Sequence, residues 1–243
     1  MTVLSRAEPD ELKAWPGHER RYPGIGDSAY LMHREITRSL VEARDTYLRS
    51  GLRILDVGCG VQPYYPLFAD IASQYDGNDV EPGPRINFVS PVEALPIEDA
   101  SYDLVLCTQV LEHVRRPYEA LREMSRVLVP GGHLFLSTLG VYPFHPHPAD
   151  YWRWTQQGFE AIFEDTEGLE LVSLVPHGGS ASAIAILVNT SVREAGRVLR
   201  APWIGVPLIT VINSIGLTID RLLPGRAKEA LVPNFLAVGQ RTV

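Results

Sequence analysis

Short apolar runs alternate with amphipathic segments along most of the chain. Apolar runs predict six strands and a short last one, at residues 52–57, 74–80, 86–89, 102–108, 133–139, 169–175 and 234–239. Apolar residues at helical spacing predict helices between them, at residues 28–48, 63–72, 117–128 and 155–165. This alternation is typical of an α/β fold with a mostly parallel sheet.

One segment interrupts the pattern. More than fifty residues separate the sixth strand from the last, whereas a hairpin loop usually has about 2–5. Two helices are expected there, each with one apolar face, made by Ile184, Val188, Val192, Ala195 and Leu199 in the first and Leu208, Val211, Ile212, Ile215, Ile219 and Leu222 in the second. The opposite face of the second helix carries Thr210, Asn213, Ser214 and Thr218.

Residues 201–219 carry no formal charge, although a solvated helix face usually does. We therefore expect segment 181–223 to pack on the domain as a lid, to form a homodimer or to touch a membrane surface. Its length is near the lower limit of about 17 residues for a membrane-spanning helix. Pro207, Asn213 and Gly216 argue against a simple span.

Composition narrows the class of protein further. A chain of 243 residues, 45% apolar and 21% charged, suits one globular domain. The net charge of −7 disfavours nucleic acid as the partner. Cys59 and Cys107 suggest neither a disulfide framework nor a metal site, and the polar residues 1–19 do not resemble a signal peptide. The expected location is the cytoplasm, with peripheral membrane association as the alternative.

The first strand ends in a glycine turn, Gly58-Cys59-Gly60. Glycine allows positive φ and lets the backbone approach a ligand, and such turns bind nucleotides at the carboxyl ends of parallel strands. Gly60 is followed by Val61, Gln62 and Pro63, so the third glycine of a dinucleotide-binding motif is missing. NAD and FAD are therefore disfavoured.

The run from Leu55 to Gly60 resembles motif I of class I S-adenosylmethionine (SAM)-dependent methyltransferases, within the methyltransferase type 11-like group. The resemblance continues through Ser101-Tyr102-Asp103 and Pro130-Gly131-Gly132, covering residues 52–139 in the family's order. It implies a Rossmann-like, seven-stranded, mostly parallel sheet with helices on both faces and SAM as cofactor. Gly58 and Gly60 would face the methionine part of SAM, with Asp56 beneath it near the ammonium group.

Further cofactor-binding residues are expected on the next strands. Asp79, at the end of the second strand, would accept hydrogen bonds from the two ribose hydroxyls. Many relatives have an adenine-binding aspartate where Pro91 stands, so backbone groups near Val92 and Glu93 are expected to hold adenine instead. The resemblance also places Thr108 and Gln109 against SAM.

The segment after the fifth strand is rich in aromatic residues, histidine and proline. His145, His147 and Asp150 are candidates for a base that removes a proton from a hydroxyl acceptor, since the pKa of histidine is about 6.5. Alternatively, Asp150 pairs with Arg153 or caps a helix. Two histidines flanking one proline make a metal site unlikely, and no metal is expected.

Two other groups near the predicted site have less clear roles. His113 follows Glu112 at a strand end and could simply begin a helix without any part in chemistry. Tyr30 and His33, on the predicted N-terminal helix, are placed near the site by family analogy alone.

These observations predict a single methyltransferase domain. It would consist of an N-terminal arm and helix, a SAM-binding core with an acceptor loop at 140–155, a helical insertion and a last strand, at residues 1–50, 51–175, 176–232 and 233–243. The predicted reaction is methyl transfer from SAM to a small molecule or glycan, at oxygen rather than nitrogen. The alternatives are a methyltransferase for a lipid-linked or quinone-like acceptor and an inactive SAM-binding scaffold.

Overall fold

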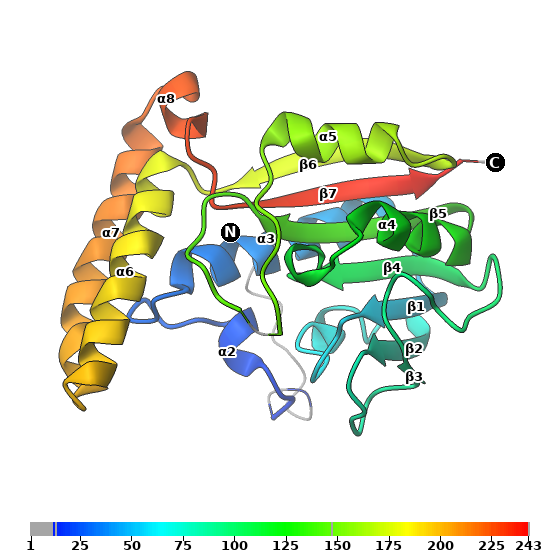
Figure 1. Ribbon diagram of the computed structural model, residues 1–243, viewed down its shortest axis with the longest axis horizontal. Coiled ribbons are helices and arrows are strands. Elements are labelled where there is room, and N and C mark those ends of the chain that lie inside the picture. Colours follow the sequence, from blue (N-terminus) through cyan, green and yellow to red (C-terminus); the bar gives the residue numbers. More distant parts are fainter. Residues whose placement is uncertain (1–11, 13, 147, 243) are drawn as a thin grey trace.

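Seven strands form one sheet in the order β3-β2-β1-β4-β5-β7-β6 (Figure 1). The computed structural model describes residues 12, 14–146 and 148–242. The strands are β1 Leu52–Val57, β2 Ala72–Asp79, β3 Phe88–Val89, β4 Tyr102–Thr108, β5 Leu128–Leu139, β6 Leu169–His177 and β7 Asn234–Arg241. β1 to β5 are parallel, and β7 is antiparallel to both β5 and β6. The predicted Rossmann-like α/β fold is confirmed.

Helices cover both faces of this sheet and bury two separate apolar cores. On one face, α3 (Tyr30–Tyr47) buries Ile36 and Leu40 against alternate residues of β1, β4 and β5. On the other face, α4 (Pro117–Val127) and α5 (Gln156–Glu164) pack over the intervening positions of the same strands. The central strands are therefore buried on both sides, which explains why they appear in the sequence as continuous apolar runs.

The prediction of a helix at residues 63–72 is wrong. The structure has only a short 3₁₀ helix, η2 (Tyr65–Leu67), within a series of turns. Pro66 lacks the N–H that the fourth residue of a helix beginning at Pro63 would donate. The apolar residues Tyr64 and Phe68 are nevertheless buried in the α3-side core, so their spacing reflected burial and not a helix.

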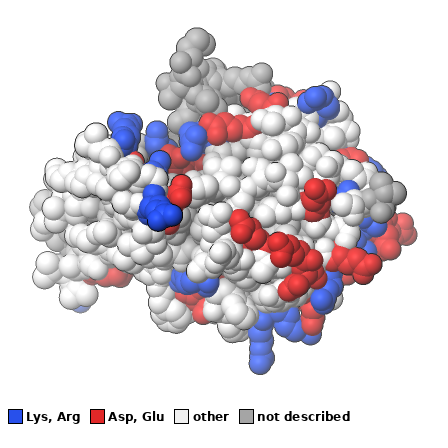
Figure 2. All heavy atoms as spheres, turned by 90° about the horizontal axis from the view of Figure 1, so that it is seen from above, with Lys and Arg blue, Asp and Glu red and all other residues white. Residues whose placement is uncertain are grey.

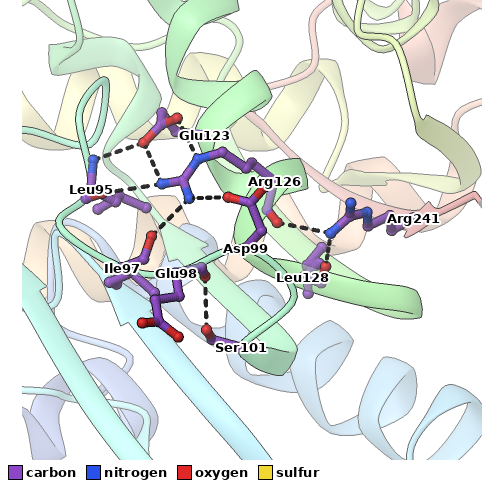
Figure 3. Close-up of polar contacts among 9 residues, drawn as sticks. All are labelled: Leu95, Ile97, Glu98, Asp99, Ser101, Glu123, Arg126, Leu128 and Arg241. Carbon is purple, nitrogen blue, oxygen red and sulfur yellow. Dashed lines mark hydrogen bonds and ion pairs between the residues drawn. The ribbon is translucent and has the colours of Figure 1, made fainter.

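Arg126 on α4 fixes the loop between β3 and β4 (Figure 3). Its guanidinium pairs with Glu123 and Asp99 and donates hydrogen bonds to the carbonyls of Leu95 and Ile97. The N–H of Leu95 donates in turn to Glu123. This network anchors the loop whose earlier part carries the predicted adenine-binding residues.

Two long helices, α6 (Ser180–Val198) and α7 (Gly205–Leu222), form an antiparallel hairpin at one end of the molecule, at the left of Figure 1. The 3₁₀ helix η4 (Pro202–Ile204) connects them, and α8 (Gly225–Glu229) leads back to β7. Of the described residues, one continuous helix, Pro202–Leu222, has the length and composition to cross a membrane. The apolar faces expected from the sequence point mostly to solvent in the single chain.

Candidate active site

A cleft of about 720 Å³ opens at the carboxyl ends of β1, β2 and β4. Parallel strands bring their carboxyl ends to one edge, which is where α/β sheets bind ligands. Seven of the eight predicted cofactor residues line this cleft: Gly58, Gly60, Asp79, Val92, Glu93, Thr108 and Gln109. Residues from four separate loops therefore meet at one site.

The glycine turn after β1 forms the floor of the cleft. Gly58 and Gly60 have φ of 60° and 53°, in the left-handed region that favours glycine. A methyl group on Gly58 would lie 2.4 Å from a methyl carbon of Val110, whereas one on Gly60 would have no atom within 4 Å. Gly58 is therefore required by packing within the protein, while Gly60 leaves open space for a ligand.

Asp79 stands at the end of β2 beside this turn. Its Oδ2 accepts a hydrogen bond of 2.9 Å from the N–H of Gly60, and its Oδ1 accepts one from the N–H of Glu81. Each carboxylate oxygen has further acceptor capacity. A half-buried carboxylate held in this way can accept hydrogen bonds from two neighbouring hydroxyls of a ligand in the cleft.

Asp56 is the predicted cofactor residue that does not line the cleft. It lies beneath the turn, 1% exposed, and its Oδ2 accepts a 2.8 Å hydrogen bond from the hydroxyl of Tyr75. Burial raises the pKa of Asp56 to about 7, partly offset by the hydrogen bond from Tyr75. A cation bound above the turn would favour the ionised form of this carboxyl.

Thr108 and Gln109 complete the central wall at the end of β4. Gln109 has a φ of 57°, and both its backbone N–H and its side-chain Nε2 donate to Ser137 of β5. These bonds hold the turn after β4 open toward the cleft. Across the cleft, the amide of Asn78 donates to Ser90 and fixes the start of the loop that carries Val92 and Glu93.

Histidines gather at the other end of the cleft. The rings of His113 and His145 meet edge to face with centroids 4.9 Å apart, and both residues line the cleft. Burial lowers the pKa of His145 below its ordinary value of 6.5, so its imidazole is neutral at neutral pH. A neutral imidazole in a cleft can accept a proton from a bound hydroxyl group.

Asp150 lies behind His145 and not in the cleft. Its side chain is 1% exposed, pairs with Arg153 through both oxygens and accepts a hydrogen bond from the backbone N–H of His145. The hydrogen bonds from Arg153 lower the pKa of Asp150 to about 2. Asp150 is thus placed to orient the loop that carries His145. It forms the pair with Arg153 that the sequence analysis gave as an alternative to a role as base. His147 lies outside the described residues.

Glu112 is fully buried beside the two histidines, in the 3₁₀ helix η3 (Leu111–His113). Its Oε2 accepts a hydrogen bond from Thr138, and burial raises its pKa. Glu112, His113 and His145 each offer one potential metal-ligand atom, and these three atoms lie within 4.8 Å of one another. This grouping contains His145, one of the two histidines of the His-Pro-His pair considered from the sequence.

Several lining residues were not found from the sequence. Arg20 reaches the cleft from the short helix α2 (His18–Arg21), in a segment expected to be a loose arm, and Tyr64 also lines it. Tyr142 lines it from within the acceptor loop expected at residues 140–155. His33 lines the cleft too, and burial lowers its pKa to about 4, whereas Tyr30 does not line it. Only tertiary packing brings Arg20 to the cleft, and no motif marks it.

Comparisons with known proteins agree with this architecture. Residues 55–136 match the family model of the methyltransferase domain. A protein of Mycolicibacterium smegmatis named "Probable S-adenosylmethionine-dependent methyltransferase" is 30% identical over 215 residues, which cover 76% of this chain and 79% of the relative. A ubiquinone biosynthesis O-methyltransferase of Vibrio cholerae is 27% identical over 158 residues, or 57% of this chain and 63% of that protein.

A solved structure supports the fold independently. A phosphoethanolamine-type N-methyltransferase of Haemonchus contortus, in complex with S-adenosylhomocysteine, superposes with a TM-score of 0.53 at 15% identity. The match covers 90% of this chain and 57% of that one. At this identity the likeness concerns the fold alone, while the M. smegmatis relative and the matched domain establish the family. The chain is therefore a member of the class I S-adenosylmethionine-dependent methyltransferases, a family of enzymes.

Proposed function

We propose that the protein transfers the methyl group of SAM to a hydroxyl oxygen of a small-molecule or glycan acceptor. The observation that carries the proposal is the placement of His145, a neutral imidazole, in the same cleft as the glycine turn and Asp79. A hydroxyl acceptor must lose its proton, whereas the positive sulfonium already activates the methyl group of bound SAM. The name of the V. cholerae O-methyltransferase relative also supports oxygen as the acceptor atom.

The residues present fit this cofactor. The open space above Gly60 leaves room for its backbone to approach the methionine part, and Asp79 has acceptor capacity for the ribose hydroxyls. Asp56 is buried under the turn, where its carboxyl would favour a bound ammonium group. Val92 and Glu93 border the space left for adenine, with Pro91 offering no polar side chain there.

At the acceptor end, each residue has a separate task. His145 would accept the hydroxyl proton, and Asp150, paired with Arg153, would position the loop that carries it. Tyr142 and Tyr151 line the same end and would pack against the acceptor. Holding the acceptor in line with the methyl group and excluding water would supply most of the remaining rate enhancement.

Calorimetry with SAM and S-adenosylhomocysteine tests the cofactor site. Asp79→Ala removes an acceptor of two hydrogen bonds, so binding should weaken by about 100-fold. Asp70→Ala is the control, because that carboxylate is mostly exposed and lies outside the cleft. A folded wild type that binds neither ligand would contradict the proposed function.

Methyl transfer itself is measured as S-adenosylhomocysteine formed with methyl glycosides and with a hydroxylated quinone as probes. Product formation that requires a free hydroxyl group on the probe supports O-methylation. If the protein binds SAM but forms no product with any hydroxyl probe, the inactive-scaffold alternative gains support.

A further inference from the structure

The hairpin of α6 and α7 exposes most of its large apolar side chains. Of 23 exposed large hydrophobic residues in the described chain, 13 lie between Ser180 and Leu222. On α7 they form one stripe along the helix, made by Leu208, Val211, Ile215, Ile219 and Leu222. Soluble monomers rarely leave so large a continuous apolar surface in water.

The interior of the hairpin consists mainly of small and polar residues, with Ile186 and Ile209 as its large buried apolar side chains. A methyl group on Gly216 would meet the Cβ of Ala185 at 3.1 Å, and one on Gly205 would meet a methyl carbon of Val192 at 3.0 Å, so the two helices approach closely. Between these points the buried amides of Asn189 and Asn213 share a 2.8 Å hydrogen bond. Small residues and interhelical polar contacts are how helices associate in lipid.

The hydroxyl groups of the hairpin satisfy their own hydrogen bonds. Thr210, Ser214 and Thr218 on α7 each donate to the carbonyl four residues earlier. Thr190 and Ser191 on α6 do the same. These hydroxyls need no water as an acceptor, so the face that carries them can leave water at low cost.

Positive charges bracket the uncharged part of the hairpin. Arg200 and Arg197, which pairs with Glu194, lie at its tip next to the exposed side chains of Leu199 and Trp203. At the other end of α7, exposed cationic residues continue through Arg221, Arg226 and Lys228. Figure 2 shows this end of the molecule, at its left, as largely uncharged, while acidic side chains gather toward the other end.

We infer that the exposed face of this hairpin docks on a bilayer containing anionic phospholipids, with α7 lying along the surface. The apolar stripe would enter the acyl boundary, Trp203 would sit at the headgroup level, and the arginines at both ends would meet phosphates. Residues 180–229 carry six cationic and three acidic side chains, and this local excess of positive charge favours an anionic bilayer over the same positive surface of a second copy. This docking goes beyond the proposed function and does not depend on it.

The attachment of α7 to the domain explains why it would lie on the bilayer and not span it. The amide of Asn213 donates to the carbonyls of Ile25 and Asp27, which precede α3. Arg193 on α6 reaches Ser28 in the same loop. The inner face of the hairpin is therefore occupied by protein, and only the outer face is available to lipid.

Co-sedimentation of the full chain with vesicles tests the inference. We expect binding to mixed phosphatidylcholine and phosphatidylglycerol vesicles, and weaker binding to phosphatidylcholine alone. Replacing two exposed side chains of the stripe, in Val211→Gln/Ile215→Gln, should weaken binding by about tenfold or more. The matched control is Val89→Gln/Val172→Gln, which changes two exposed valines of the sheet (54% and 41% exposed) and should bind as the wild type does.

Two further variants separate the contribution of positive charge to vesicle binding from that of Trp203. Arg197→Gln/Arg200→Gln should lose about tenfold in affinity for the anionic vesicles but little for neutral ones. Brominated lipids should quench tryptophan fluorescence in the wild type and much less in Trp203→Phe.

Light scattering measures the oligomeric state and so tests whether a second copy of the chain, and not lipid, covers the outer face of the hairpin. Failure of the folded wild type to bind either vesicle would overturn the inference. A dimer that Val211→Gln/Ile215→Gln dissociates, without vesicle binding, would show that a second copy covers this face. Equal loss of binding in the sheet control would show that the hairpin has no specific role. Circular dichroism confirms that each variant is folded.

Discussion

The sheet core and the helical hairpin use apolar residues in opposite ways. In the core, Phe135 and Leu134 on neighbouring positions of β5 are fully buried, one on each face of the sheet. In the hairpin, the corresponding large side chains, such as Ile215 and Ile219, are 52% and 42% exposed, and Asn213 is fully buried. Both regions are apolar in sequence, so hydrophobicity alone does not tell which side of an element faces the protein.

The contrast has a functional counterpart. The core directs its polar groups to the carboxyl edge of the sheet, where Asp79 and His145 line one cleft. The hairpin uses its polar groups internally and leaves an apolar exterior. Changes in the cleft should therefore affect catalysis and cofactor binding, while changes on the outer hairpin face should leave both unchanged.

The largest expected effect is on the rate of methyl transfer. His145→Gln removes the proposed base, and kcat should fall by about 100-fold or more with a hydroxyl acceptor. In the wild type, activity should decrease only as the pH falls below 6.5, because the lowered pKa keeps His145 neutral above that value. If the rate of His145→Gln still falls at low pH as the wild-type rate does, the assignment of His145 as the base is contradicted. Val211→Gln on the hairpin is the control and should keep the wild-type rate.

The glycine turn allows cofactor binding to be separated from stability. Gly60→Ala and Gly51→Ala both introduce a side chain at positive φ with no atom within 4 Å, so both should lose about 1–2 kcal/mol of unfolding free energy. Only Gly60 lines the cleft, so only Gly60→Ala should weaken SAM binding, by about tenfold. Calorimetry and urea unfolding measure the two effects. Equal SAM affinity in both variants would remove Gly60 from the site.

The buried polar contact of the hairpin should matter more than its exposed apolar residues. Asn213→Leu leaves the carbonyls of Ile25 and Asp27 without their amide donor, so unfolding free energy should fall by about 2–4 kcal/mol. Val211→Gln, on the outer face, should change it by less than about 0.5 kcal/mol. Urea unfolding compares the stabilities of the two variants. A larger loss in Val211→Gln than in Asn213→Leu would contradict a hairpin with a polar interior and an apolar exterior.

The smallest expected effect comes from chelation. Although Glu112, His113 and His145 lie close together, Glu112 accepts from Thr138 and its pKa is raised by burial, which disfavours the ionised ligand form. We therefore expect EDTA to leave the methyl-transfer rate unchanged. Loss of activity that zinc or magnesium restores would instead identify these three residues as a metal site.

The sheet was largely predictable from the sequence because each central strand is buried on both faces and appears as an apolar run. β4 was predicted with the observed bounds, Tyr102–Thr108. The prediction of a helix at residues 63–72 was wrong because the helical spacing of Tyr64 and Phe68 reflects their burial, and Pro66 lacks an N–H that such a helix would use. Similarly, helical spacing located α6 and α7 but not the direction in which their faces point.

For the candidate site, motifs predicted residues that act through local backbone geometry. The turn at Gly58 and Gly60 needs positive φ, and Asp79 ends the adjacent strand, so both leave a local signal. Arg20 leaves none, because it reaches the cleft only through packing of segments distant in sequence. The position of Asp150 outside the cleft likewise depends on its pairing with Arg153 and on its hydrogen bond from the N–H of His145.

The sequence by itself determined the α/β core, the glycine turn and the family, because periodicity and strand-end motifs are local. The tertiary structure decided which groups share the cleft and which face of the hairpin meets solvent. Both depend on contacts between distant segments, such as Asn213 with the loop before α3. The chain's most apolar helix is therefore attached to the protein through an asparagine and presents its apolar stripe outward.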